Sequence, residues 1–188
     1  GSPSGKLSDT FAKKLEDYPS SETFHESVKY VDYKEDIYVG YRYFETIPGA
    51  DKAVNYPFGY GLSYTTFERA LVSAEEKQGV IRVRVNVTNT GKYPGKEVMQ
   101  LYAQAPQGVL GKAKRVLAAF EKTRLLAQGE TQLLTLEAPV AQLASYDDLG
   151  KIQKSAYVLE KGKYQFYLGT SVRETEQVFC FTMPEDTV

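Results

Sequence analysis

Residues 80–88 read VIRVRVNVT, and this stretch decides the fold class. From Ile81 onward apolar side chains alternate strictly with polar ones, so Ile81, Val83, Val85 and Val87 share one face, while arginine, asparagine and threonine fill the other. Successive side chains of a β-strand point to opposite faces, and this period of two predicts an antiparallel strand with one buried face. We therefore expect a β-rich domain around this strand.

Further strand-like stretches, separated by turn residues, flank residues 80–88. TFERALVSAEE (66–76) precedes a turn at Gln78-Gly79, and EVMQLYAQ (97–104) is apolar on both faces, as expected of a central strand. The remaining candidates are KRVLAAFEKTRL (114–125), GETQLLTLEAP (129–139), YVLEKGKYQFYLGTS (157–171) and QVFCFTM (177–183). About seven strands with turns at intervals of roughly a dozen residues predict an antiparallel β-sandwich of the immunoglobulin or fibronectin type III kind.

Two of these stretches carry more specific expectations. Residues 157–171 read as one hairpin that turns across Glu160 to Lys163, with Tyr164, Phe166 and Leu168 on one face. Cys180 lies within VFCF and is the only cysteine of the chain, so no internal disulfide can form. Its apolar neighbours predict a small buried side chain.

The stretch IYVGYRYFETIPGADKAVNYPFGYGLSY (37–64) has the opposite composition to a flexible linker. Flexible linkers are polar and rich in Gly and Ser, whereas this one is aromatic and punctuated by proline and glycine. Its tyrosines could stack on sugar rings, or they could pack between two bodies of protein; we favour packing. The residues predicted to dock one domain against another are Tyr41, Arg42, Tyr43, Phe58, Tyr60 and Tyr64. We expect Arg42 to stack on a ring or to pair with a carboxylate.

The composition excludes several function classes. The net charge is −1 and the basic residues are scattered, which argues against a nucleic-acid or anionic-membrane partner. The sequence has no run of 18 apolar residues, the minimum length expected of a membrane-spanning helix. His25 is the only histidine, so a zinc site or a Ser-His-Asp triad would depend on it alone, and we expect it at the surface. The sequence indicates no cofactor.

Several strings of residues match a known enzyme family. PSGKL near the start, YVGYRYFE (38–45) and YPFGYGLSYTTFE (56–68) resemble the end of the second domain of glycoside hydrolase family 3, the β-glucosidases. VNVTNTGKYPGKEVMQLY (85–102), RVLAAFEKTRLLAQGE (115–130) and GKYQFYLGTS (162–171) resemble the fibronectin type III-like domain of that family. The resemblance implies two parts: residues 1–64 as the tail of an α/β domain with an aromatic linker, and residues 65–188 as the β-sandwich.

The same resemblance implies that the catalytic groups lie elsewhere. Family members are retaining enzymes that act on terminal β-D-glucosides, with an aspartate nucleophile on a barrel domain and an acid/base carboxylate on the α/β domain. No position of this chain matches either group. Its partners would be the barrel and α/β domains of a parent enzyme, and substrate would be met only through that parent. SYDDLGKIQKSAYVLEKG (145–162) also resembles members in which the barrel comes last, and both domain orders stay open.

The residues themselves offer no alternative catalytic pair. Retaining glycoside hydrolysis needs two carboxyl groups roughly 5–5.5 Å apart. The adjacent acidic pairs are Glu16-Asp17, Glu35-Asp36, Glu75-Glu76 and Asp147-Asp148, and neighbours on a strand point to opposite faces. We read Asp147-Asp148, just before Gly150, as part of a turn. The expected function is therefore a non-catalytic accessory segment of a β-glucosidase, with a stand-alone carbohydrate-binding or spacer module as the alternative.

Overall fold

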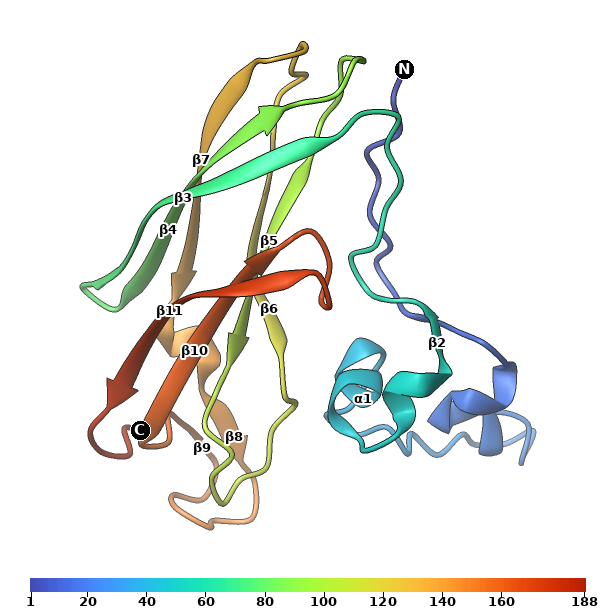
Figure 1. The fold of residues 1–188 in the computed structure, drawn as a ribbon. Coiled ribbons are helices and arrows are strands. Elements are labelled where there is room, and N and C mark those ends of the chain that lie inside the picture. The colour runs from blue at the N-terminus through green and yellow to red at the C-terminus, as the bar shows by residue number, and fades with distance from the viewer.

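Two antiparallel sheets pack face to face in the computed structural model, which describes residues 1–188 (Figure 1). The first sheet has the order β3-β4-β7 and the second the order β11-β10-β5-β6. These seven strands confirm the predicted sandwich. Their bounds are β3 Phe67–Lys77, β4 Val80–Asn89, β5 Val98–Gln104, β6 Val116–Lys122, β7 Thr131–Pro139, β10 Gly162–Gly169 and β11 Thr175–Met183.

The core lies between the two sheets and follows the alternation seen in the sequence. The four alternating apolar residues of the opening stretch, Ile81, Val83, Val85 and Val87, are fully buried on β4. They face Met99, Leu101 and Ala103 of β5 together with the inward residues of β10. Burial of this apolar area is the main force that holds the sheets together.

The first hairpin of the sandwich has the turn chemistry that the sequence predicts. β3 and β4 pair from Phe67 opposite Asn89 to Lys77 opposite Val80. The two residues between them, Gln78 and Gly79, both have a positive φ, 54° and 75°. This left-handed conformation at both central positions matches the right-handed twist of the flanking strands, so the turn sets the register of the sheet.

Two expectations about the last third of the chain are wrong. Residues 157–171 do not form one hairpin, because β9 (Ala156–Val158) pairs with β8 (Ser145–Asp147), whereas β10 pairs with β5 and β11. Cys180 is exposed rather than buried. Phe179 and Phe181 pack against the core of the sandwich, so the alternation of β11 turns the residue between them outward.

A smaller body of short elements precedes the sandwich. It contains β1 (Phe11–Ala12), α1 (Tyr41–Thr46) and β2 (Val54–Tyr56), and β1 pairs with β2. Three short 3₁₀ helices complete it: η1 Leu15–Asp17, η2 Pro19–Glu22 and η3 Ala50–Ala53. A fourth, η4 (Val140–Leu143), follows β7 in the sandwich. No helix of the chain is both long and apolar enough to cross a membrane.

Two extended segments connect this body to the sandwich. The start of the chain and the stretch that follows β2 run side by side next to the second sheet (Figure 1), and the second of them contacts the outer face of β5 through Phe58 and Gly59. The amide of Leu7 donates to the carbonyl of Tyr60 at 2.7 Å, and the amide of Gly59 donates to the carbonyl of Leu7 at 2.8 Å. We call residues 1–8 and 57–64 the paired strap.

Candidate functional site

The N-terminal body is anchored on the outer face of the second sheet by aromatic rings. Tyr41, the first residue of α1, stacks on Phe58 of the paired strap with ring centroids 4.3 Å apart. Both rings meet the ring of Tyr102 edge-on, at 6.4 Å and 6.5 Å between centroids. Tyr102 lies on β5 and is completely buried. These rings therefore form an aromatic anchor, defined as Tyr41, Phe58 and Tyr102.

The anchor explains why β5 is apolar on both faces. Met99, Leu101 and Ala103 point into the sandwich core, and the alternate residues Gln100 and Tyr102 point to the opposite face. The outer face of a sandwich strand is normally solvated, but here Gln100 and Tyr102 are both buried. The pattern of a central strand thus arises because both faces of β5 are buried. The other sheet covers one face, and the N-terminal segments cover the other.

Gln100 joins the anchor to two loops through a satisfied polar network. Its side-chain nitrogen Nε2 donates to the carbonyl of Gly59 at 3.1 Å and to that of Thr170 at 2.7 Å. Its oxygen Oε1 accepts the hydroxyl proton of Tyr102. Burial raises the pKa of Tyr102 far above its ordinary value, so this hydroxyl stays protonated and keeps donating. A buried amide with all of these partners fixes the strap at one position along β5.

Polar contacts from the loop between β10 and β11 hold the other side of the N-terminal body. The amide of Val172 donates to the carbonyl of Phe58 at 3.0 Å. Arg173 pairs with Glu45 of α1 at 2.8 Å and donates to the carbonyl of Asp51 at 3.1 Å. Arg115 in turn donates to the carbonyl of Val172 and lies 4.0 Å above the ring of Tyr167. The loop is therefore bonded both to the sandwich and to the N-terminal body.

Two further bonds attach α1 to the start of β6. The amide of Leu117 donates to the hydroxyl oxygen of Tyr41 at 2.8 Å, and the amide of Lys114 donates to the hydroxyl oxygen of Thr46 at 2.8 Å. β6 is the last strand of its sheet, so these amides face no further strand. The helix supplies the acceptors that a neighbouring strand would otherwise provide.

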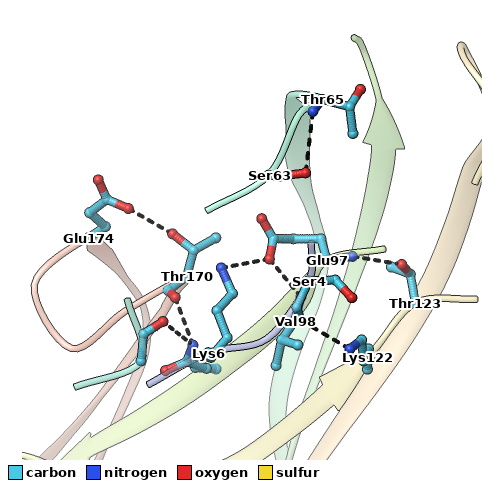
Figure 2. A network of polar contacts seen from close by, with 12 residues as sticks. Ser4, Lys6, Ser63, Thr65, Glu97, Val98, Lys122, Thr123, Thr170 and Glu174 are labelled. Carbon is cyan, nitrogen blue, oxygen red and sulfur yellow. Dashed lines mark hydrogen bonds and ion pairs between the residues drawn. The ribbon is translucent and has the colours of Figure 1, made fainter. Parts of the chain in front are cut away.

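The first residues of the chain are held by two lysine contacts. Figure 2 shows Lys6 directed at Glu97, just before β5, and the Nζ–Oε1 distance is 2.8 Å. The Nζ atom of Lys122, at the end of β6, donates to the carbonyl of Ser4 at 3.0 Å. Both side chains of the Lys6–Glu97 pair are largely buried. These contacts tie the paired strap to the sheet along its length.

The predicted docking residues separate into three groups. Tyr41 and Phe58 belong to the aromatic anchor. Tyr43 packs edge-on against Phe44 within the N-terminal body, and Tyr60 lies beside Tyr56. Tyr64 is 71% exposed. Arg42 is exposed as well and forms none of the ion pairs or ring contacts that we expect for it.

Sequence reasoning missed the sandwich side of this interface. Gln100, Tyr102, Arg115 and Arg173 are the groups that receive the N-terminal body. One signal was present, because a glutamine and a tyrosine interrupt the apolar run of residues 97–104 at positions facing away from the core. Such an interruption marks a buried polar contact rather than a wet face.

A cleft of about 660 Å³ opens between the N-terminal body and one end of the sandwich. Asp36, Ile37 and Arg42 line one side, and residues 110–113 and 142–149 line much of the other. Its lining is mixed: apolar residues such as Leu117, Ala118 and Leu143 occur together with charged side chains of both signs. We call this the basal cleft.

Two buried charges stiffen the loops on the sandwich side of the basal cleft. Lys112 pairs with Glu160, and both side chains are nearly inaccessible. Burial lowers the pKa of Lys112, and the charge of Asp186 opposes that shift. Glu160 also accepts the amide of Val109 at 2.7 Å, so one carboxylate holds the loop between β5 and β6 at two points.

Asp147 organises the loop between β8 and β9. Its carboxylate accepts the backbone amides of Gly150, Lys151, Ile152 and Gln153 at 2.7–3.0 Å. Burial by itself raises the pKa of this carboxyl, but the four amide donors outweigh burial and the net shift is downward. The turn expected at Asp147-Asp148 is therefore present, and it is a rigid one.

Several carboxylates of the chain serve structural purposes. Asp147 caps a loop, Glu160 pairs with a buried lysine, and Glu45 pairs with Arg173. No group of three or more His, Cys, Asp or Glu side chains is placed to hold a metal ion. His25 is exposed, as expected, and lies edge-on against the ring of Phe24. What the geometry supports is the attachment of one body of protein to another.

Comparison with known proteins agrees with the fold and extends it. Residues 97–172 match the model of the fibronectin type III-like domain family. The chain is 61% identical to β-glucosidase A of Butyrivibrio fibrisolvens over 92% of its own length, which is 23% of that enzyme. It thus spans about a fifth of the curated relatives, since it covers 19% of a second one from Ruminococcus albus.

Solved structures show the same arrangement of both parts. The structure of a β-glucosidase from Paenibacillus barengoltzii superimposes with a TM-score of 0.93 at 50% identity, and covers 99% of this chain and 21% of that enzyme. A glycoside hydrolase family 3 β-glucosidase from Bifidobacterium adolescentis gives a TM-score of 0.85 at 33% identity, over 98% of this chain and 26% of that protein. The likeness covers the N-terminal body as well as the sandwich.

Proposed function

We propose that this chain braces the catalytic domains of a parent enzyme. The premise is that the chain is a segment of the glycoside hydrolase family 3 β-glucosidases with their fibronectin type III-like domain. The aromatic anchor carries this proposal. The half-buried rings of Tyr41 and Phe58, the buried ring of Tyr102 and a satisfied glutamine network join the sandwich to the N-terminal body at one fixed position. A rigid joint of this kind orients one domain against another.

The N-terminal body itself supplies a second support. Its exposed large apolar side chains are concentrated between residues 11 and 39, and they include Phe11, Leu15, Phe24, Val28, Tyr30, Val31, Tyr33, Ile37 and Val39. Monomeric soluble proteins rarely leave so much apolar surface uncovered in one short segment. In this proposal, residues 1–64 complete an α/β domain of the parent, and that domain covers these side chains.

The six predicted docking residues then have divided roles. Tyr41 and Phe58 fasten the joint to the sandwich, whereas the exposed Arg42 and Tyr64 are free to meet the parent's other domains. Tyr43 and Tyr60 shape the N-terminal body from within. Residue 64 marks the proposed boundary between the two parts, because β3 begins at Phe67.

The parent would hydrolyse terminal β-D-glucosides with retention of configuration. Its two catalytic carboxyl groups would come from outside this chain, in which Asp147 caps a loop and Glu160 and Glu45 are held in ion pairs. The segment would contribute by holding the domains that bear those groups in their productive geometry. Rigid positioning of this kind can account for large changes in rate when it is lost.

The test compares the isolated chain with the full-length protein that carries it. The isolated chain is expected to show no turnover of an aryl β-glucoside above buffer. In the full-length protein, Phe58→Ala is expected to lower kcat/KM, and the exposed Leu125→Ala serves as a control with wild-type activity. Turnover by the isolated chain that depends on one of its own carboxylates would overturn the proposal.

A further inference from the structure

We propose that the basal cleft is a second docking surface, and that it receives a segment of the parent enzyme's own polypeptide from outside residues 1–188. This inference rests on the proposed function, because it assumes a parent with further domains. It names a surface distinct from the aromatic anchor, and it shares only Ile37 with the exposed apolar side chains of residues 11–39. The argument rests on the chemistry of the cleft, the rigidity of its rim and its continuity with an existing interface.

The cleft has the anatomy of a protein interface. Its lining is mixed, with apolar residues beside Asp36, Asp148, Arg42 and Lys151. Interfaces between the domains of one chain are also mixed and are more polar than obligate interfaces. Two apolar side chains of the lining are open to solvent: Leu149 is 71% exposed and Tyr146 is 52% exposed. A single exposed leucine is ordinary, but two large apolar side chains exposed in one cleft indicate a covered surface.

The rim on the sandwich side is already ordered without an occupant. The carboxylate of Asp147 holds four consecutive amides of the loop that presents Leu149. Glu160 fixes the adjacent loop through Val109 and Lys112, and Lys151 joins the two loops by donating to the carbonyl of Val109 at 3.0 Å. A loop that is rigid before binding loses little entropy when a partner docks.

The cleft is continuous with an interface that the chain already contains. Ile37 and Arg42 of the N-terminal body form one wall, and α1 is bonded through Tyr41 to the amide of Leu117, another lining residue. An occupant would therefore touch both bodies at once and lock their relative position. The relatives supply its source, since this chain is about a fifth of their length. Charge of both signs on the rim favours an equally mixed protein surface over a strongly charged ligand.

Hydrogen exchange on the isolated chain and on the full-length protein tests the proposal. The amides of Tyr146, Asp148 and Leu149 are expected to exchange at least about tenfold more slowly in the full-length protein. Leu149→Asp is expected to abolish that difference while leaving the Tm of the isolated chain unchanged, because the side chain is exposed. Ile37→Asp, on the opposite wall, is expected to act in the same way.

Leu125→Asp is the matched control, since Leu125 is 57% exposed and lies outside the basal cleft. It is expected to leave the exchange of the cleft amides unaltered. Equal exchange rates in the isolated and full-length proteins would overturn the proposal. Protection that appears in the isolated chain only as its concentration rises would assign the cleft to a second copy, and would also overturn it. If Phe58→Ala lowers activity while the cleft shows no protection, the bracing role stands and this docking surface fails.

Discussion

The ring of Tyr41 stacks on the ring of Phe58 with an interplanar angle of 29°, and this pair fastens the N-terminal body to the sandwich. The two residues come from opposite ends of the aromatic stretch that the sequence marks as docked. Between them the chain forms α1, η3 and β2 and returns to the sheet. The contact therefore closes a loop, which the bonds of Arg173 to Glu45 and to the carbonyl of Asp51 also hold in place.

Phe58→Ala is expected to destabilise the isolated chain by about 2 kcal/mol, less than the roughly 3–5 kcal/mol of a fully buried aromatic, because Phe58 is only half-buried. Urea unfolding followed by tyrosine fluorescence measures this, since the chain has no tryptophan. Tyr64→Ala, at an exposed position, should stay within about 0.5 kcal/mol of the wild type. Equal effects of the two variants would contradict the anchoring role of Phe58.

Gly59→Ala is expected to displace the paired strap. A Cβ atom at Gly59 would lie 2.1 Å from Oε1 of Gln100, and the backbone has a φ of +79°. Gly129 separates the steric clash from the backbone strain, because its φ is +77° but a Cβ there meets nothing within 4 Å. Gly129→Ala should cost about 1 kcal/mol through its backbone conformation alone. Thermal unfolding should show a clearly larger loss for Gly59→Ala; similar losses would mean that Gln100 can move aside.

Lys112→Met is expected to destabilise the chain by roughly 3–5 kcal/mol, because it leaves the buried carboxylate of Glu160 without a partner. The double variant Lys112→Met/Glu160→Gln should recover most of this loss, since the glutamine is neutral and still accepts the amide of Val109. Chemical unfolding of the single and double variants gives the coupling energy. Additive losses would show that the two side chains do not interact.

Asp147→Asn is expected to destabilise the loop between β8 and β9 at neutral pH. The folded-state pKa of Asp147 lies below its ordinary value of 3.8, so the ionised carboxylate stabilises the fold above that pH. This contribution is lost as the pH falls through the folded-state pKa. The Tm difference between wild type and variant should therefore be constant near pH 7 and shrink below about pH 4. A difference independent of pH would assign the effect to packing alone.

The sequence by itself determined the sandwich. The strict alternation of residues 81–88 and the Gln78-Gly79 turn specify a half-buried strand and its hairpin partner, because both signals are local. Local signals failed where pairing is set by distant residues. β9 joins β8 rather than β10, and Cys180 faces water because Phe179 and Phe181 take the inward positions of β11.

Only the tertiary structure decided which residues receive the aromatic stretch. Gln100 and Tyr102 read as members of a central strand, and their role became visible once Tyr41 and Phe58 were seen to cover the outer face of β5. Contacts of this kind join residues that lie 40 or more positions apart in the chain, such as Gly59 and Gln100. A periodic pattern records that a face is buried, but it does not record what buries it.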